Sequence, residues 1–223
     1  MTQNKLFVAM AGNIGAGKTT VAKMISQTFG FELFDEPVID NRFLKHYYGD
    51  MKRWSFTLQM EFLIKRVEHH HLIGSIGKHC IQDRTLLEDP EIFAKYLHGL
   101  GNMTDQELEL YFDYYRRLTK ELHHPTKIIY LHAPEVSLLQ ERIRSRGRVE
   151  ERNIPAQFLA GLNGYYSSFP VVCSQKYGLD VKVFEITRED IRHGDSRTRF
   201  LKEVEQFLFE AHHIPPREPA SAS

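Results

Sequence analysis

Short apolar runs and longer stretches of helical periodicity alternate along the whole chain. Runs typical of buried strands lie at residues 6–11, 31–34, 79–82, 127–131 and 181–186. Apolar residues recur at the spacing of a helix over residues 19–29, 54–73, 89–100, 105–122, 136–146, 155–168 and 199–211. This alternation predicts an α/β fold, a five-stranded parallel sheet flanked by helices on both faces.

Polar segments follow the first three predicted strands. They are the glycine-rich residues 12–20, the sequence Asp35-Glu36-Pro37 and the pair Asp83-Arg84. In a parallel sheet of this kind, ligands bind beyond the carboxyl ends of the strands. We therefore expect the three segments to face one cleft.

The glycine-rich segment matches G-x-x-x-x-G-K-[ST], the pattern of a phosphate-binding P-loop. It reads Gly12-Asn13-Ile14-Gly15-Ala16-Gly17-Lys18-Thr19-Thr20. The backbone N–H groups of such a loop surround the phosphates, Lys18 would reach the β- and γ-phosphates, and the Thr19 hydroxyl would hold Mg²⁺. The motif predicts a nucleoside triphosphate ligand and leaves kinase, GTPase and ATPase activities open. The chain has no Asn-Lys-x-Asp guanine-reading sequence, which argues against a GTPase.

Charge and composition narrow the range of partners. The 223 residues include 29 basic and 29 acidic side chains, so the formal net charge is zero. A neutral chain is not typical of a nucleic-acid-binding protein or of a polybasic membrane anchor. No apolar run approaches the roughly 20 residues that span a bilayer, and the first predicted strand begins too early for a signal peptide. Cys80 and Cys173 are too few for a disulfide framework, so buried thiols and a cytoplasmic location are expected.

Arginines cluster at the end of the predicted helix 136–146. Arg142 and Arg146 are four residues apart and share a helix face, whereas Gly147 ends the helix and turns Arg148 in another direction. Such a cluster is either a solvated surface or a phosphate-binding one. No internal linker is visible, so we expect one domain over residues 1–214 and a disordered, proline-rich tail over 215–223.

Five motifs, in order and at compatible spacing, resemble those of the deoxynucleoside kinase family. They are the P-loop, Glu36-Pro37-Val38, Arg53-Trp54-Ser55-Phe56 with Gln59, Asp83-Arg84-Thr85 with Asp89, and Arg146-x-Arg148-x-Glu150-Glu151. The resemblance extends from residue 8 to about residue 209. It implies an enzyme of nucleotide salvage that moves the γ-phosphate of ATP, with Mg²⁺, to the 5′-hydroxyl of a deoxynucleoside. It also implies a homodimer that pairs through helices, for which residues 113–115 are candidates beside ordinary core packing.

The resemblance assigns roles to the residues around the predicted cleft. Glu36 would accept or orient the proton of the 5′-hydroxyl, as a carboxylate beside an attacking oxygen can. Arg84 would stabilise charge on the attacked phosphate, as would Lys18, and Asp83 would assist Thr19 at the Mg²⁺. Asp83 stands where many relatives carry the longer Glu, so its reach toward the metal is shorter.

The arginine cluster resembles the family lid, at about residues 142–153. By this resemblance Arg142, Arg146 and Arg148 clamp the triphosphate of ATP when the lid closes. Tyr48 and Glu151 would hold the 3′-hydroxyl of the sugar. A tyrosine packed against the sugar leaves no room for a 2′-hydroxyl, which favours deoxyribose over ribose.

The base would be read from the long helix 54–73. Gln59 and Arg66 are two helical turns apart, so both lie on one face, and Gln59 offers a donor and an acceptor to a base edge. A plainer role for Gln59 is to bind a backbone group. By the resemblance, Arg66 pairs with Asp89 and Phe93 packs on the base. Family members with this pair act on purine deoxynucleosides or deoxycytidine, so deoxyadenosine is favoured and deoxyguanosine and deoxycytidine stay open.

Two other functions stay open on the residues alone. One is another small-molecule P-loop kinase, such as a nucleoside monophosphate kinase, although no second phosphate site is visible beyond the lid. The other is a nucleotide-binding subunit that keeps the fold without turnover, against which the intact Lys18, Glu36 and Arg84 argue. His69-His70-His71 is not read as a metal site, because consecutive helical positions point about 100° apart and cannot converge.

Overall fold

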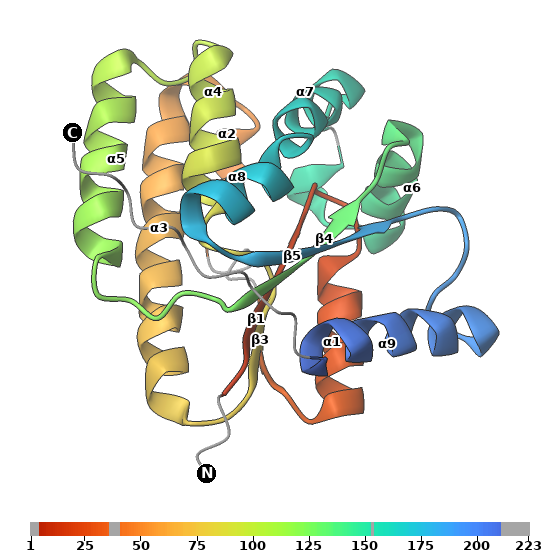
Figure 1. Cartoon of the computed structure of the whole chain (residues 1–223). Helices are drawn as coiled ribbons and strands as arrows, with labels where there is room; N and C mark the ends of the chain where they lie inside the picture. Colours follow the sequence, from red (N-terminus) through yellow and green to blue (C-terminus); the bar gives the residue numbers. More distant parts are fainter. Residues whose placement is uncertain (1–4, 36–40, 153, 211–223) are drawn as a thin grey trace. The chain divides into compact units, whose positions relative to one another are not determined.

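The predicted α/β fold is confirmed in a computed structural model that describes residues 5–35, 41–152 and 154–210. Its parallel sheet has the strand order β2-β3-β1-β4-β5 (Figure 1). The strands are β1 (Phe7–Gly12), β2 (Glu32–Phe34), β3 (Cys80–Gln82), β4 (Lys127–His132) and β5 (Asp180–Glu185). Each predicted strand is therefore present, with ends that move by no more than a residue or so.

Helices follow the strands, and helices from residues 1–189 cover both faces of the sheet. The helices of this part of the chain are α1 (Lys18–Phe29), α2 (Leu44–Tyr47), α3 (Met51–Ile76), α4 (Lys95–Gly99), α5 (Asp105–Thr119), α6 (Val136–Arg146), α7 (Ala156–Tyr166) and α8 (Phe169–Tyr177), and α9 (Gly194–Phe209) follows them in the sequence. A π-helix, η1 (Asp89–Ala94), precedes α4, and a 3₁₀ turn, η2 (Val149–Glu151), follows α6. In Figure 1, α3 and α5 lie on one side of the sheet and α1 and α6 on the other.

Several elements differ from the prediction. The helix expected over residues 89–100 is a π-helix followed by a short α-helix. The short elements α2 and η2 and the helix α8 were not expected. Pro170 stands at the start of α8, where proline is well tolerated because the first N–H groups have no partner within the helix. The last helix begins at Gly194, earlier than the expected residue 199.

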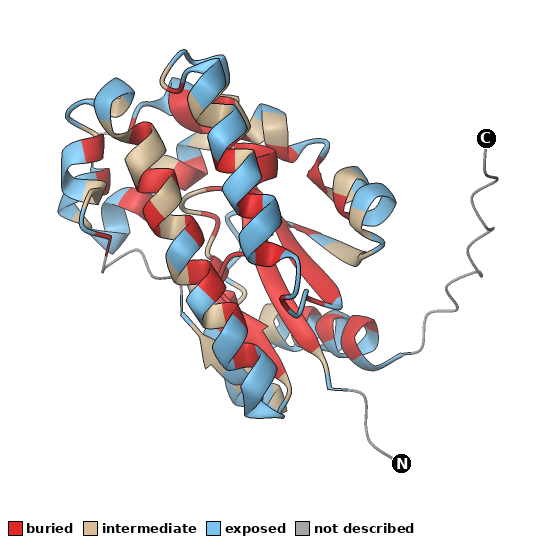
Figure 2. Cartoon of the chain, turned by 90° about the vertical axis from the view of Figure 1, so that its left-hand side faces the viewer, coloured by how far each residue is buried: buried red, intermediate tan, exposed pale blue. Residues whose placement is uncertain are grey.

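The strand β1 forms the centre of the core. It pairs in parallel with β3 through Val8 and Ile81 and with β4 through Val8 and Lys127. All six of its residues are buried, as expected of a strand with a neighbour on each side and helices on both faces. Figure 2 shows the central strands in red, the colour of buried residues.

The chain divides into two compact units, residues 1–189 and 190–223. The first unit contains the sheet and every predicted site residue, and the second contains α9. The single domain over 1–214 stays a prediction, and the expected tail at 215–223 lies outside the described residues. Among the described helices, none combines the length and the apolar character needed to cross a membrane.

Candidate functional site

The P-loop connects the end of β1 to the start of α1, as predicted. A side chain at Gly12 is excluded because its Cβ would lie 2.8 Å from the carbonyl oxygen of Leu131, at a φ of +147°. The Lys18 ammonium folds back into the loop and donates to the carbonyl oxygens of Gly12 at 2.7 Å and Asn13 at 3.0 Å. This places a buried positive charge inside the predicted phosphate cradle.

The two residues predicted to hold a metal lie together. The Thr19 hydroxyl, at the start of α1, donates a hydrogen bond to Oδ2 of Asp83, directly after β3. Magnesium prefers oxygen ligands and is held by few protein groups besides phosphates and water. A hydroxyl and a carboxylate beside the phosphate cradle therefore fit this ion.

Arg84 lies in an unusual backbone conformation at the same end of the sheet. Its φ is +79°, and it is the one non-glycine residue with positive φ among the described residues. The guanidinium Cζ lies 4.8 Å from the ring centre of Phe93, a cation–π distance. Its Nη1 also donates to Oε1 of Glu88 and to the Tyr166 hydroxyl, at 3.3 Å each. The side chain is thus held by groups from η1 and α7.

The predicted pair between α3 and η1 is present and buried. Arg66 Nε donates to Oδ2 of Asp89 at 2.6 Å, and both residues are 1% exposed. Burial raises the pKa of Asp89 to about 6, although Arg66 and Arg84 oppose the shift. The carboxylate is therefore ionised at neutral pH, and it has one further oxygen that can accept a hydrogen bond.

Two buried polar atoms, one on α3 and one on α5, lack hydrogen-bond partners within the described part of the chain. They are Oε1 of Gln59, on α3, and the hydroxyl of Tyr111, on α5. Burial, and then the charge of Asp89, raises the pKa of the Tyr111 hydroxyl well above its usual value. Buried polar groups are normally hydrogen-bonded, so both atoms are candidates to bind a ligand. Tyr111 was not predicted, because its position reads as an ordinary apolar helix position.

The predicted lid residues contact one another and the P-loop. Arg146 donates to Oε2 of Glu151, and Arg148 Nη1 lies 3.3 Å from its Oε1. Gly147 ends α6 at a φ of +75°, so the predicted break between the two arginines is present. Arg142 donates instead to the carbonyl oxygen of Ala16 in the P-loop, at 3.1 Å. The cluster is therefore not a simple solvated surface.

The remaining sugar and base residues are placed in part. Burial raises the pKa of the Tyr48 hydroxyl well above its usual value, and the charge of Glu151 adds to the shift. These two predicted partners therefore interact electrostatically. Glu36, the predicted proton acceptor, lies outside the described residues. Its role stays a prediction.

Sequence reasoning missed Glu88 and Tyr166, which hold the P-loop, and the contacts of the Asn13 side chain. The Asn13 amide donates to the carbonyl oxygen of Leu159 at 2.9 Å and to Oδ1 of Asn163 at 2.8 Å, both on α7. Glu88 accepts from the backbone N–H of Gly12 at 2.9 Å, and the Tyr166 hydroxyl lies 2.9 Å from the carbonyl oxygen of Gly12. These contacts join distant segments, so no local spacing indicates them.

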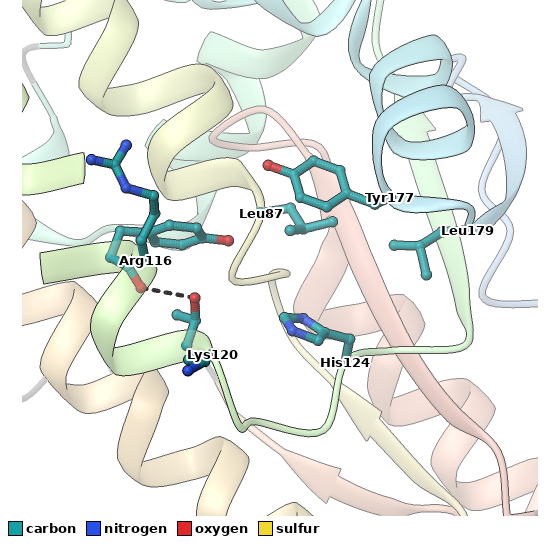
Figure 3. A pocket seen from close by; sticks show the side chains of 8 residues that line it. Leu87, Arg116, Lys120, His124, Tyr177 and Leu179 are labelled. Atoms are coloured by element: carbon teal, nitrogen blue, oxygen red, sulfur yellow. Dashed lines mark hydrogen bonds between the residues drawn. The ribbon is translucent and has the colours of Figure 1, made fainter. Parts of the chain in front are cut away.

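A cavity of about 310 Å³ lies elsewhere in the first unit (Figure 3). It is lined by Leu87, Tyr115, Arg116, Thr119, Lys120, His124, Tyr177 and Leu179. None of these residues is a predicted site residue. The cavity is therefore not the predicted active site, although Leu87 belongs to the segment that follows β3.

Comparisons with known proteins agree with the geometry. The profile of the family described as deoxynucleoside kinase matches residues 8–209. The chain is 33% identical to a deoxyguanosine kinase of Bacillus subtilis over 92% of this chain and 95% of the relative. It is 35% identical to a deoxyadenosine kinase of Dictyostelium discoideum over 73% of this chain and 65% of the relative.

A solved structure has the same fold. The deoxyadenosine kinase of M. mycoides with bound dATP superposes with a TM-score of 0.77 at 30% identity, covering 90% of this chain and 99% of that one. The relatives share one activity, the phosphorylation of deoxynucleosides. This activity agrees with the sheet, the P-loop and the residue pairs Thr19–Asp83 and Arg66–Asp89. The chain belongs to the deoxynucleoside kinase family and is an enzyme of that class.

Proposed function

We propose that the enzyme transfers the γ-phosphate of ATP to the 5′-hydroxyl of deoxyadenosine, in cytoplasmic nucleotide salvage. The observation that carries the proposal is the hydrogen bond from Thr19 to Asp83. It joins the phosphate-binding loop to the segment that contains Arg84, proposed to contact the transferred phosphate, and Asp89, proposed to contact the base of the acceptor. Donor and acceptor sites are then adjacent, as in-line phosphoryl transfer requires.

The reaction forms one P–O bond and breaks another. Glu36 accepts the proton of the 5′-hydroxyl, whose oxygen attacks the γ-phosphorus while the bond to the β,γ-bridging oxygen breaks and ADP leaves. Lys18 and Arg84 stabilise the negative charge on the transferred group. Thr19 and Asp83 would hold Mg²⁺, which neutralises charge on the β- and γ-phosphates when it is bound.

The lid and the sugar contacts complete the proposed site. Arg142 already contacts the P-loop, whereas Arg146 and Arg148 bind Glu151. We propose that these two arginines turn to the triphosphate when ATP binds, which leaves Glu151 to accept from the 3′-hydroxyl beside Tyr48. Binding of both substrates and closure of the lid are then coupled.

The base preference rests on the pair Arg66–Asp89 and on Gln59. Asp89 is ionised near neutral pH and can accept from an exocyclic amine while it stays paired with Arg66. Phe93 would pack on the base. Adenine and cytosine offer such an amine, and thymine does not. Deoxyguanosine stays open as an acceptor.

The experiment is a panel of deoxynucleosides, ribonucleosides and nucleoside monophosphates assayed with Mg²⁺ and ATP. Deoxyadenosine is expected to exceed thymidine by well over about tenfold in kcat/KM, which corresponds to roughly 1.4 kcal/mol. Equal activity on thymidine would refute the proposed base pocket but not the assignment as a deoxynucleoside kinase. Transfer to monophosphates alone would favour a nucleoside monophosphate kinase. ATP binding without any transfer would favour a non-catalytic subunit.

Replacing Glu36 by Gln tests the proton acceptor. The change keeps the shape of the side chain and removes its basicity, so kcat is expected to fall by about 100-fold with little change in deoxynucleoside affinity. Lys18→Ala is the companion variant, expected to weaken ATP binding while the deoxynucleoside still binds. Turnover of Glu36→Gln within about threefold of the unmodified enzyme would exclude this role.

We also propose a homodimer that pairs through helices. On α5, Leu110, Tyr114 and Leu118 are four residues apart and 45%, 45% and 38% exposed. Ile64 and Leu72 of the neighbouring helix α3 are also exposed. An exposed apolar row of this kind supports the proposal of an interface. Of the three residues expected at the interface, Asp113 and Tyr114 are exposed and Tyr115 is buried.

A further inference from the structure

Glu88 is a fully buried carboxylate that belongs to none of the predicted site residues. It lies between β3 and η1 and is 0% exposed. Its Oε1 accepts from the backbone N–H of Gly12 at 2.9 Å, from the Tyr166 hydroxyl at 2.5 Å and from Arg84 Nη1 at 3.3 Å. Its Oε2 accepts from the backbone N–H of Thr85 at 2.9 Å. One side chain thus connects the P-loop, the segment after β3 and α7.

Glu88, Tyr166 and Lys18 together hold both polar backbone groups of Gly12. The N–H group of Gly12 donates to Glu88, and its carbonyl oxygen lies 2.9 Å from the Tyr166 hydroxyl and 2.7 Å from Lys18 Nζ. Gly12 is the residue at which β1 turns into the P-loop. Its orientation sets where the loop, and the ammonium of Lys18, lie relative to a phosphate.

The same carboxylate also holds Arg84. The positive φ of Arg84 is sparsely populated by residues with a side chain, and it persists where surrounding contacts impose it. Glu88 supplies two of these contacts, one to the Arg84 guanidinium and one to the next N–H along the chain, that of Thr85. Without the carboxylate, the backbone turn and the guanidinium of Arg84 each lose one of the contacts that hold them.

We infer that Glu88, together with Tyr166, is a positioning residue that sets Arg84 and the P-loop in register for phosphoryl transfer. It touches neither substrate; it acts through Arg84, Gly12 and Lys18. The inference rests on the proposed role of Arg84. It predicts that loss of the carboxylate reduces the rate of transfer and leaves the deoxynucleoside affinity unchanged.

Glu91 provides a matched control three residues further along the chain, within η1. It is buried and accepts from Lys95 at 2.5 Å, from Lys176 at 2.6 Å and from the Tyr177 hydroxyl at 2.7 Å. Like Glu88 it joins η1 to another helix through several charged and hydroxyl donors. Its hydrogen bonds reach α4 and α8 and not the P-loop or Arg84.

The experiment compares Glu88→Gln, Glu91→Gln and Tyr166→Phe in the full chain, with kcat, both KM values, deoxynucleoside affinity and Tm. Glu88→Gln is expected to lower kcat by about 100-fold and to change deoxynucleoside affinity by less than about threefold. Tyr166→Phe, which removes one oxygen, is expected to lower kcat by about 3- to 10-fold. Glu91→Gln is expected to lower Tm and to leave kcat within about twofold.

A double variant separates positioning from general destabilisation. In an Arg84→Lys background, Glu88→Gln should lower kcat by much less than about 100-fold, because one of the groups through which Glu88 acts, the Arg84 guanidinium, is already lost. Full additivity, equal kcat losses in Glu88→Gln and Glu91→Gln, or unchanged kcat in Glu88→Gln would each overturn the inference. If Glu88→Gln does not fold, unchanged kcat in Tyr166→Phe would overturn it. Absence of transfer by the unmodified enzyme would instead refute the proposed function.

Discussion

The surroundings of His70 could not be predicted from its neighbours in the sequence. It stands in a run of three histidines on α3, yet it alone of the three is buried. Its Nδ1 lies 2.8 Å from the carbonyl oxygen of His123 and its Nε2 3.1 Å from Oε1 of Gln82, in β3. The ring therefore joins α3 to the sheet, and burial lowers its pKa from 6.5 to about 4.

This shift predicts an acid sensitivity of folding. Between pH 6.5 and pH 4 the unfolded chain binds a proton at His70 that the folded chain does not, so stability decreases as pH falls through that window. From pH 7 to pH 5 the loss is expected to be about 1 to 2 kcal/mol. Urea unfolding of the unmodified protein and of His70→Gln at both pH values measures it.

The difference between the two proteins isolates His70 from other titrating groups. Asp89 acts in the opposite sense, because its pKa of about 6 lies above the ordinary 3.8 and its protonation favours the folded state as pH falls. That effect is common to both proteins and cancels. Parallel pH profiles for the two proteins would contradict the assignment to His70.

Among single residues, the sequence predicted the roles that depend on residues adjacent in the chain. Lys18 and Thr19 belong to a contiguous motif, and Gly147 was recognised as a helix stop. Glu88 and the side chain of Asn13 were not recognised, because their partners are far along the chain. Tertiary contacts that carry no fixed spacing leave no local pattern to read.

At the scale of elements, periodicity located each strand and most helices but not the type of helix at residues 89–94. Over so short a stretch, a π-helix has the same pattern of apolar residues as an α-helix, and only the hydrogen-bond pattern distinguishes the two. This element matters because it begins at Asp89 and contains Phe93, both predicted to contact the base. Single π-turns are frequent at functional sites, which agrees with this placement.

Removing the first side chain of this element should alter base selection. Asp89→Ala takes away the carboxylate that pairs with Arg66 and would accept an amine, so kcat/KM for deoxyadenosine is expected to fall by about 100-fold or more. The low activity on thymidine should change by less than about threefold, because thymine offers no amine. Steady-state kinetics with both substrates measures the ratio.

The control variant is Asp180→Ala, which removes a carboxylate paired with Lys127. Both residues lie at the N-terminal ends of their strands, β4 and β5, away from the predicted site. The control variant should leave the ratio of the two activities unchanged. An equal loss on both substrates in Asp89→Ala would indicate a role in folding alone.

At the scale of the whole molecule, α5 has two apolar faces. Tyr111, Tyr115 and Thr119 are buried, and Leu110 and Tyr114 are each 45% exposed one position earlier. One face packs against other residues of the first unit, and the other is the face that we propose contacts a second copy of the chain. Sequence periodicity alone could not separate the two, because both consist of apolar residues at helical spacing.

A change of Leu110 and Tyr114 to Glu should therefore convert the enzyme to a monomer. Light scattering after gel filtration is expected to give about half the mass of the unmodified protein, because two buried carboxylates without partners are costly at an apolar interface. Val171→Glu, at a similarly exposed position on α8, is the control and should keep the mass. A monomeric unmodified protein would rule out the homodimer.

The position of β1 has a consequence for synthesis of the chain. The strand leaves the ribosome first, but its partners are Ile81 on one side and Lys127 on the other. At about 5 to 20 residues per second, its first neighbour follows on the order of ten seconds later and its second later still. During that interval a wholly apolar strand has unpaired edges, which favours aggregation. The nascent chain should therefore depend on chaperones until β4 emerges.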